Sequence, residues 1–168
     1  GAARRGFVAV PEYVALLRGI APSNPNQRNE KLRLAVEELG FDDVRTVISS
    51  GNVLFRSDST DPAELEATLE KAWPEKLGFN STTITRSIPD LQQLVEWDPF
   101  AGYEHGRETY LLVTFCKHPV GIEVELPHQV PDGASQLIAA TERELFTVTD
   151  TTKGSSVDVM GWLDKTFE

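Results

Sequence analysis

The sequence predicts an α+β protein: a ferredoxin-like first subdomain of order β-α-β-β-α-β, packed against a second, smaller α+β subdomain. The continuous apolar run Tyr13–Leu17 is typical of a strand that is covered on both faces. Two short apolar runs flank the small residues Ser49, Ser50 and Gly51, which indicates a β-hairpin. Apolar residues at helical spacing occur before and after this hairpin, so one helix is expected on each side of it.

A long structured loop separates the first strand from the first helix. Arg18 and Gly19 end the strand, and residues 20–29 contain two prolines and three asparagines, a composition typical of turns. Asn29 is the predicted N-cap of a helix over Glu30–Leu39. The apolar face of this helix consists of residues at positions i, i+3, i+4 and i+7, namely Leu32, Ala35, Val36 and Leu39.

Caps and β-branched residues predict the other elements of the first subdomain, residues 13–86. Asp61, Pro62 and Glu64 have the spacing of an N-cap, a first-turn proline and a capping-box acid, and so begin a second helix. Pro74 is expected to shorten this helix or to kink its end. The remaining strands are predicted at Val44–Ser49, Asn52–Arg56 and Thr82–Arg86.

The second subdomain is predicted over residues 87–168, and residues 1–12 are interpreted as an N-terminal tail. Ser87 is placed to cap a short helix, whereas residues 120–130 fit no single class. No linker is long enough to separate two independent domains, so we expect one compact unit. The further elements predicted are a strand at Thr109–Cys116, a hairpin of Gln136–Ala140 and Leu145–Thr149, and a last helix at Val157–Phe167.

Charge is distributed unevenly along the chain. Residues 1–86 carry eleven basic and twelve acidic side chains, while residues 87–168 carry five and fourteen. An acidic surface repels a phosphate backbone, so non-specific nucleic-acid binding is not expected as the main activity. The apolar run Phe7–Val10 is far shorter than a signal-peptide core or a membrane span, so no membrane association is expected either.

Cys116 is the only cysteine of the chain, so it has no internal partner for a disulfide. It follows an apolar strand-like run, which favours a buried structural thiol over a nucleophile. A reducing, cytoplasmic setting is consistent with this cysteine usage.

The usual chemical motifs are missing from the sequence. His105, His118 and His128 have no spacing that would form a metal site. The Ser49-Ser50 pair lacks the strand-to-helix context of a nucleophile elbow, and neither a Walker phosphate loop nor a dinucleotide fingerprint occurs. We therefore predict no catalytic residue, no metal and no cofactor.

One candidate site follows from topology. A right-handed crossover would make the first two strands parallel, so the loop after the first strand and the hairpin turn would emerge at the same end of the sheet. Side chains and backbone N–H groups there suit a phosphate or carboxylate. The alternative is purely structural, with Asn29 as a cap, Gly51 as a turn residue and solvated arginines. The candidate residues are Arg18, Gly19, Arg28, Asn29, Ser49, Ser50, Gly51 and Asn52.

Three classes of function remain open at this point. The first is a binding module for a small anionic or nucleotide-like ligand. The second is an enzyme that acts on a phosphorylated substrate, and the third is a protein-interaction domain whose acidic half meets a basic partner. The sequence does not specify an oligomeric state.

Three ordered runs together closely resemble the bacterial domain-of-unknown-function family 1697. They are Tyr13–Ile20, Glu38–Thr46 and Ile48–Phe55, and the later run Glu142–Thr152 is similar to the family too. The resemblance implies an α+β protein with a ferredoxin-like first part and no established activity. Many members have a glycine-rich loop where this chain has residues 21–26, so a function of that loop is not carried over to this chain. Members usually continue through a threonine, arginine and tryptophan segment beyond the position of Glu168, and we expect that this sequence lacks that element.

Overall fold

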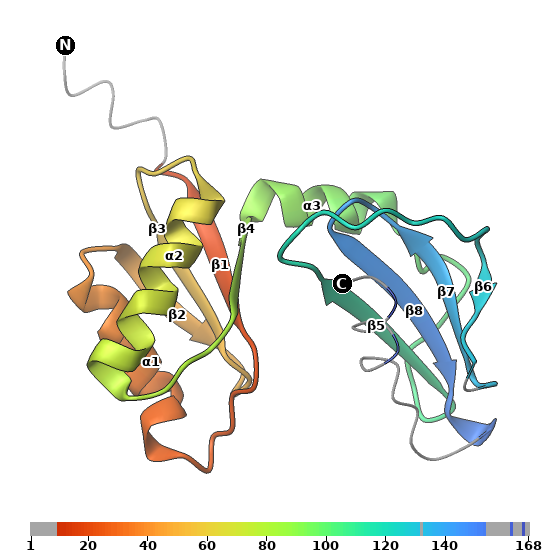
Figure 1. Cartoon of the computed structure of the whole chain (residues 1–168), viewed down its shortest axis with the longest axis horizontal. Coiled ribbons are helices and arrows are strands. Elements are labelled where there is room, and N and C mark those ends of the chain that lie inside the picture. The colour runs from red at the N-terminus through yellow and green to blue at the C-terminus, as the bar shows by residue number, and fades with distance from the viewer. Residues whose placement is uncertain (1–9, 132, 154–161, 163–165, 167–168) are drawn as a thin grey trace. The chain divides into compact units, whose positions relative to one another are not determined.

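The computed structural model describes residues 10–131, 133–153, 162 and 166, and these residues form two compact units that divide between Gln93 and Leu94 (Figure 1). The described residues contain three α-helices and two antiparallel four-stranded sheets. The protein is therefore of the α+β class, as the sequence predicts.

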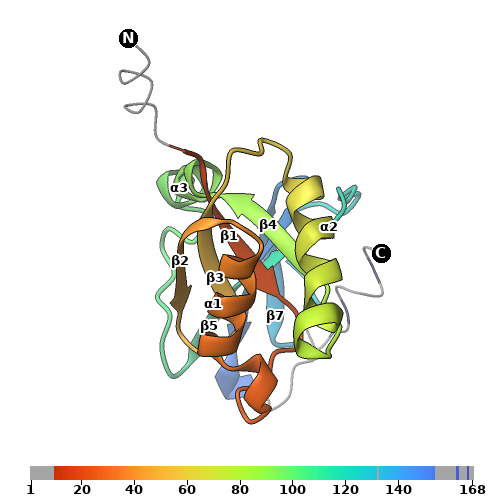
Figure 2. The same cartoon turned by 90° about the vertical axis from the view of Figure 1, so that its left-hand side faces the viewer.

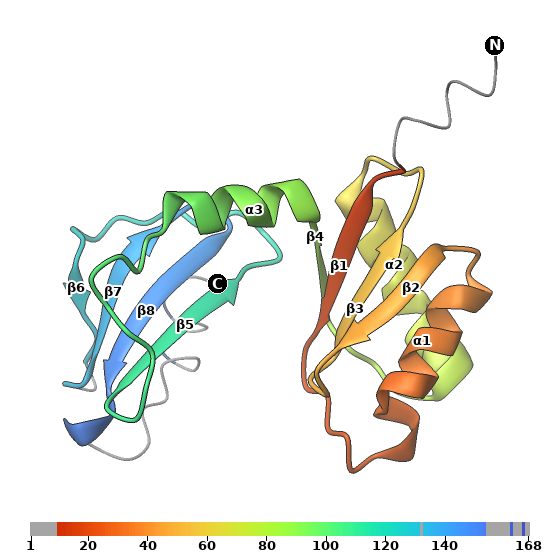
Figure 3. The same cartoon turned by 180° about the vertical axis from the view of Figure 1, so that it is seen from behind.

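The sheet of the first unit has the strand order β2-β3-β1-β4, and all its neighbouring strands are antiparallel (Figure 3). β1 and β3 are central, which agrees with the doubly apolar pattern of the first strand. In the register, Leu16 lies opposite Asn52 of β3 and Ile84 of β4. The strands are β1 (Glu12–Leu17), β2 (Asp42–Val47), β3 (Asn52–Arg56) and β4 (Thr83–Ser87).

Helices α1 (Asn29–Glu38) and α2 (Pro62–Ala72) cover one face of this sheet (Figure 2). Alternate residues of the central strands point to the helices, because successive side chains of a strand point to opposite faces. The core of the unit consists of Tyr13, Ala15, Leu17, Leu32, Ala35, Val36, Val53, Phe55, Leu65, Leu69 and Trp73.

The start of α1 differs from the prediction. Arg28, not Asn29, occupies the N-cap, with extended backbone angles (φ −74°, ψ 152°) and no side-chain cap hydrogen bond. Asn29 is the first helical residue, and its side-chain amide donates to the Ile48 carbonyl over 3.0 Å. The asparagine that does cap is Asn24, which begins a 3₁₀ turn at Pro25–Gln27.

Helix α2 begins as predicted, since the Asp61 carboxylate accepts a hydrogen bond from the Ala63 N–H over 3.0 Å. The α-helix ends at Ala72, and the next five residues, Trp73–Leu77, form a π-helical turn. Gly78, with φ +77°, then ends the helical segment. The predicted effect of Pro74 is consistent with this change of helix type.

The sheet of the second unit has the strand order β5-β8-β7-β6. Helix α3 (Ile88–Trp97) precedes it and is capped by Ser87, whose hydroxyl accepts from the Asp90 N–H. The predicted hairpin is present as β7 and β8, and residues 120–127 contain no strand. The strands are β5 (Thr109–Phe115), β6 (His128–Gln129), β7 (Ser135–Ala140) and β8 (Glu144–Asp150).

Two features of the second unit bear on earlier predictions. Cys116 directly follows β5 and packs against a cluster centred on Leu137 and Leu145, but it is only partly buried, so the prediction of a buried thiol was wrong. The predicted helix Val157–Phe167 lies outside the described residues except for Trp162 and Thr166, which are helical.

Within the part of the chain that the structure describes, no helix has the length and apolar character needed to cross a membrane.

Candidate functional site

The structure brings the predicted loop and turn together at one end of the first sheet. The Leu17 N–H donates to the Gly51 carbonyl over 3.0 Å, and the Asn29 side chain reaches the Ile48 carbonyl over the same distance. We call residues 18–29 and 48–52 the corner. The topological argument from the sequence therefore located these two stretches correctly.

Gly51 is the tightest position of the corner. It is buried and has φ +83°, a left-handed conformation that favours glycine. A Cβ atom at this residue would lie 2.7 Å from Ile20 Cγ1 and 3.1 Å from the Leu17 carbonyl oxygen. The turn packs directly on the loop, so glycine is required for both backbone and steric reasons.

Both predicted arginines are exposed at the corner. The backbone of Arg18 is fixed, because its N–H donates to the Thr82 carbonyl over 2.9 Å and its carbonyl accepts from the Ser81 hydroxyl over 2.7 Å. Arg28 Nε donates to the Pro22 carbonyl over 3.4 Å, a long hydrogen bond within the loop. The Arg18 side chain therefore extends from an anchored backbone, whereas the Arg28 guanidinium is itself held on the loop.

The polar residues of the corner divide by role. The Asn29 side chain, at the start of the helix, donates to the Ile48 carbonyl of the turn. Asn52 Nδ2 donates to the Ser50 hydroxyl over 3.0 Å, so both amides stabilise the local structure. Ser49 and Ser50 are exposed, as is Gly19, whose φ is +73°. The structural alternative thus accounts for Asn29, Gly51 and Asn52, while Arg18, Arg28, Ser49 and Ser50 present exposed side chains at the corner.

Sequence analysis missed one residue of the corner, Ile48. It has φ +48° and is 69% exposed, an uncommon conformation and environment for a β-branched residue. No sequence signal marks it, because isoleucine normally favours strands. Positive φ values thus occur at three positions of the corner, Gly19, Ile48 and Gly51.

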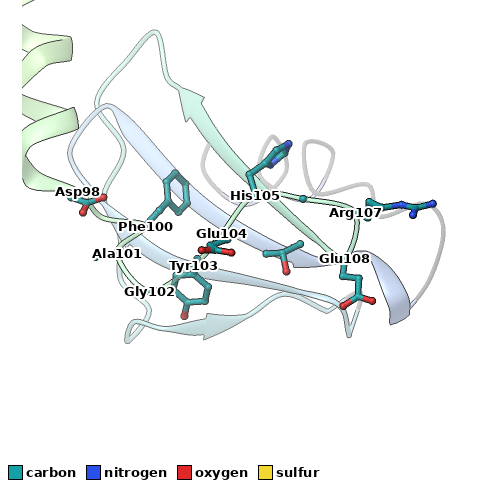
Figure 4. Close-up of a pocket in the computed structure, with 11 residues that line it drawn as sticks. Asp98, Phe100, Ala101, Gly102, Tyr103, Glu104, His105, Arg107 and Glu108 are labelled. Atoms are coloured by element: carbon teal, nitrogen blue, oxygen red, sulfur yellow. The ribbon is translucent and has the colours of Figure 1, made fainter.

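A second feature is an open concavity of about 950 Å³ in the second unit, formed by the connection between α3 and β5 (Figure 4). Three exposed carboxylates, Asp98, Glu104 and Glu108, line it together with Tyr103. His105 also lines it, and its Nδ1 accepts a hydrogen bond from the Leu111 N–H over 3.2 Å. Arg107 lines it as well, so three carboxylates face one guanidinium and the concavity is acidic on balance, which favours cations over anions.

Metal chemistry has no candidate among the described residues, which contain no group of three or more His, Cys, Asp or Glu side chains that could hold an ion. The three histidines lie in different settings. His105 contacts the Tyr110 ring, His128 stacks on Trp162, and His118 is exposed after β5.

Comparison with known proteins assigns the chain a family but no activity. The model of a family described as "Protein of unknown function (DUF1697)" matches residues 10–146. That match covers both sheets up to the middle of β8 and includes the whole corner. Among curated proteins and solved structures, none matches the chain significantly.

Proposed function

We propose that this chain, which belongs to the DUF1697 family, is a binding module that takes a phosphate or carboxylate group at the corner. The observation that carries the proposal is the start of α1, which has Arg28 at its N-cap and no side-chain cap. The first N–H groups of a helix have no partner within the helix and carry partial positive charge. An anion is a suitable partner for such groups.

The surroundings of this helix start favour the same ligand. The hydrogen bonds Leu17–Gly51 and Asn29–Ile48 hold the turn beside the helix, so little ordering would accompany binding. Two arginines and two serine hydroxyls are exposed on the same corner and can donate to an anion. Glu30, the acidic residue in the first turn, opposes an anion and should keep its affinity modest.

A phosphate titration followed by backbone amide shifts tests the proposal. We expect shifts at Gly19, Asn29 and Gly51 that weaken as salt rises. Arg28→Ala should weaken phosphate binding about threefold to tenfold, as expected when one charge-assisted hydrogen bond is lost. Glu30→Gln should strengthen phosphate binding, because the substitution removes the repulsion between the Glu30 carboxylate and the anion and keeps the size of the side chain.

The control is Arg107→Ala, which removes the same charge from an exposed position of the second unit. It should leave phosphate binding unchanged. The proposal would be wrong if phosphate moved no amide of the corner, or if Arg107→Ala weakened binding as much as Arg28→Ala.

We also propose that the first unit has a ferredoxin-like arrangement. The strand order β2-β3-β1-β4 and the helices after β1 and β3 support this assignment. The arrangement explains why loop and turn meet at the corner, since the end of β1 lies beside the start of β3.

A further inference from the structure

The exposed aromatic side chains of the second unit gather in one stretch of the chain. Among the described residues of this unit, the large apolar side chains that are exposed all lie between positions 95 and 110. They are Val95, Trp97, Tyr103 and Tyr110. Exposed apolar clusters are typical of interaction surfaces, and tryptophan and tyrosine are enriched where binding energy concentrates. We call residues 97–108, from the last residue of α3 to the start of β5, the acidic loop.

Packing on the second sheet holds the first rings of the acidic loop in place. The rings of Trp97 and Phe100 both meet the buried Phe146 ring edge-on, with ring centres 5.4 and 5.6 Å away. Trp97 nevertheless remains 50% exposed. The Tyr103 N–H donates to the Phe100 carbonyl over 2.9 Å, so the tyrosine follows this anchored pair in a turn. Because these groups are already ordered, binding would cost little conformational entropy.

The far end of the acidic loop is anchored as well. The Thr151 hydroxyl donates to the Arg107 carbonyl over 2.6 Å, and the Thr151 N–H donates to the Glu108 carbonyl over 3.0 Å. His105 Nδ1 accepts from the Leu111 N–H of β5. The concavity that the loop forms is therefore tied to the sheet at both ends.

The charge of this concavity indicates the chemistry of a partner. Its three carboxylates, those of Asp98, Glu104 and Glu108, are exposed, and none forms an ion pair within the described part of the chain. Figure 4 shows them spread along the loop, and no three acidic or histidine side chains among the described residues are placed to hold one metal ion. An extended cation fits this spacing better than a single ion.

We propose that the acidic loop is a binding surface for an arginine-rich peptide segment of another protein. A guanidinium group stacks on an aromatic ring and donates to a carboxylate with the same planar group. Lysine provides the charge without the flat, bidentate geometry, so arginine is preferred. The surface lies in the second unit and takes the opposite charge from the corner, so it is independent of the anion site proposed above.

A titration of the full-length protein with a capped peptide of alternating glycine and arginine tests the proposal. We expect amide shifts at Gly102, Glu104 and Gly106, and a shift of the indole N–H signal of Trp97, which Trp97→Phe identifies. These shifts should weaken as salt rises. The same peptide with citrulline in place of each arginine keeps the shape but loses the charge, and it should bind about tenfold more weakly.

Substitutions in the acidic loop separate the aromatic contribution from the charge. Tyr103→Ala should weaken binding of the arginine peptide about fivefold, whereas Tyr103→Phe keeps the ring face and most of the affinity. The double variant Glu104→Gln/Glu108→Gln should weaken binding about tenfold. Arg107→Gln should strengthen it, because the substitution removes the one arginine that lines the concavity.

Glu123→Gln/Glu125→Gln is the matched control, because it removes two exposed carboxylates from elsewhere in the same unit. It changes the net charge by the same amount and should leave the affinity for the arginine peptide within about twofold. Equal weakening in the two double variants would show general attraction to an acidic protein and would overturn the proposal. Equal binding of the arginine and citrulline peptides, or no shift in the acidic loop, would overturn it too.

Discussion

Gly51 is the residue at which the local geometry of the corner is decided. Gly51→Ala would force a Cβ atom to within 2.7 Å of Ile20 and strain a backbone with φ +83°. We expect a loss of about 2–4 kcal/mol in the free energy of unfolding, from strain and overpacking together. Urea unfolding measures this loss.

Gly19 is the matched control for that substitution. Its φ is also positive, at +73°, but a Cβ atom there would meet nothing within 4 Å. Gly19→Ala should therefore lower the free energy of unfolding only through backbone strain, by about 1 kcal/mol. Equal losses at the two glycines would contradict the packing that we describe between turn and loop.

The ionisation of the Tyr13 phenol makes the stability of the first unit depend on pH. Burial raises the pKa of its phenol above the usual 10.0, and the nearby Asp90 carboxylate raises it further. The hydroxyl donates to the Ser59 carbonyl over 2.6 Å, and the ring stacks with Phe55. The pKa of the folded state exceeds that of the unfolded state, so this stabilisation is fully present below pH 10 and is lost as pH rises through the raised value.

Tyr13→Phe tests this linkage because it keeps the ring and removes the titrating group. We expect a loss of about 1 kcal/mol at neutral pH, from the hydrogen bond. Above pH 10 the difference from the wild type should shrink, because only the wild type loses stability through this phenol. Unfolding free energies at neutral and alkaline pH give the comparison, and a difference that grows with pH would contradict it.

At the scale of elements, α2 covers the β4 edge of the first sheet. β4 is an edge strand, and its outward N–H groups would be left without strand partners. The Thr85 N–H donates to the Glu66 carboxylate over 2.8 Å, and the Thr83 N–H donates to Glu70 over 3.1 Å. Residues four apart on a helix thus match residues two apart on a strand, because both spacings are about 6–7 Å.

Glu66→Ala should therefore weaken the edge of the sheet. Glu66 is buried, and its removal would leave the Thr85 N–H without this acceptor, so we expect a loss of about 1–3 kcal/mol. Glu66→Gln keeps an acceptor oxygen and should lose less. Amide hydrogen exchange at Thr85 reports the effect directly. Exchange at Thr85 that is as slow in Glu66→Ala as in the wild type would show that this carboxylate does not protect the edge.

Elements with strong local signals could be predicted from the sequence, and those that depend on distant partners could not. The apolar run of β1, the Asp61 cap of α2 and the β7–β8 hairpin were located within one or two residues. Asn29 was misassigned as a cap because its amide is used by Ile48, nineteen residues away. β6 was missed, since only two residues pair with β7 and no pattern marks so short a strand.

The same limit applies to the candidate site. Chain topology alone predicted that loop and turn would meet, and the Leu17–Gly51 hydrogen bond confirms that proximity. The partner of Gly51 was not predictable, because Ile20 reads in the sequence as an ordinary loop residue. The positive φ of Ile48 was not predictable from the sequence either, because it depends on how the hairpin closes.

At the scale of the whole molecule, the described residues contain two separate hydrophobic clusters. The first is built by β1, β3 and the helices α1 and α2, and its most buried members include Leu69. The second is centred on Leu137 and Leu145 of the other sheet. The two clusters belong to the two compact units, which divide at residues 93 and 94.

This division leads to a prediction about cooperativity. Leu69 and Leu137 are each fully buried in one of the two clusters, so Leu69→Ala and Leu137→Ala should each lose about 2–5 kcal/mol. If each unit is a cooperative unit of its own, faster amide exchange should be confined to residues 10–93 in the first variant and to residues 94–153 in the second. The losses should add in the double variant, because the sites share no partner. Exchange that accelerates throughout the chain in either single variant would show that the two units unfold together.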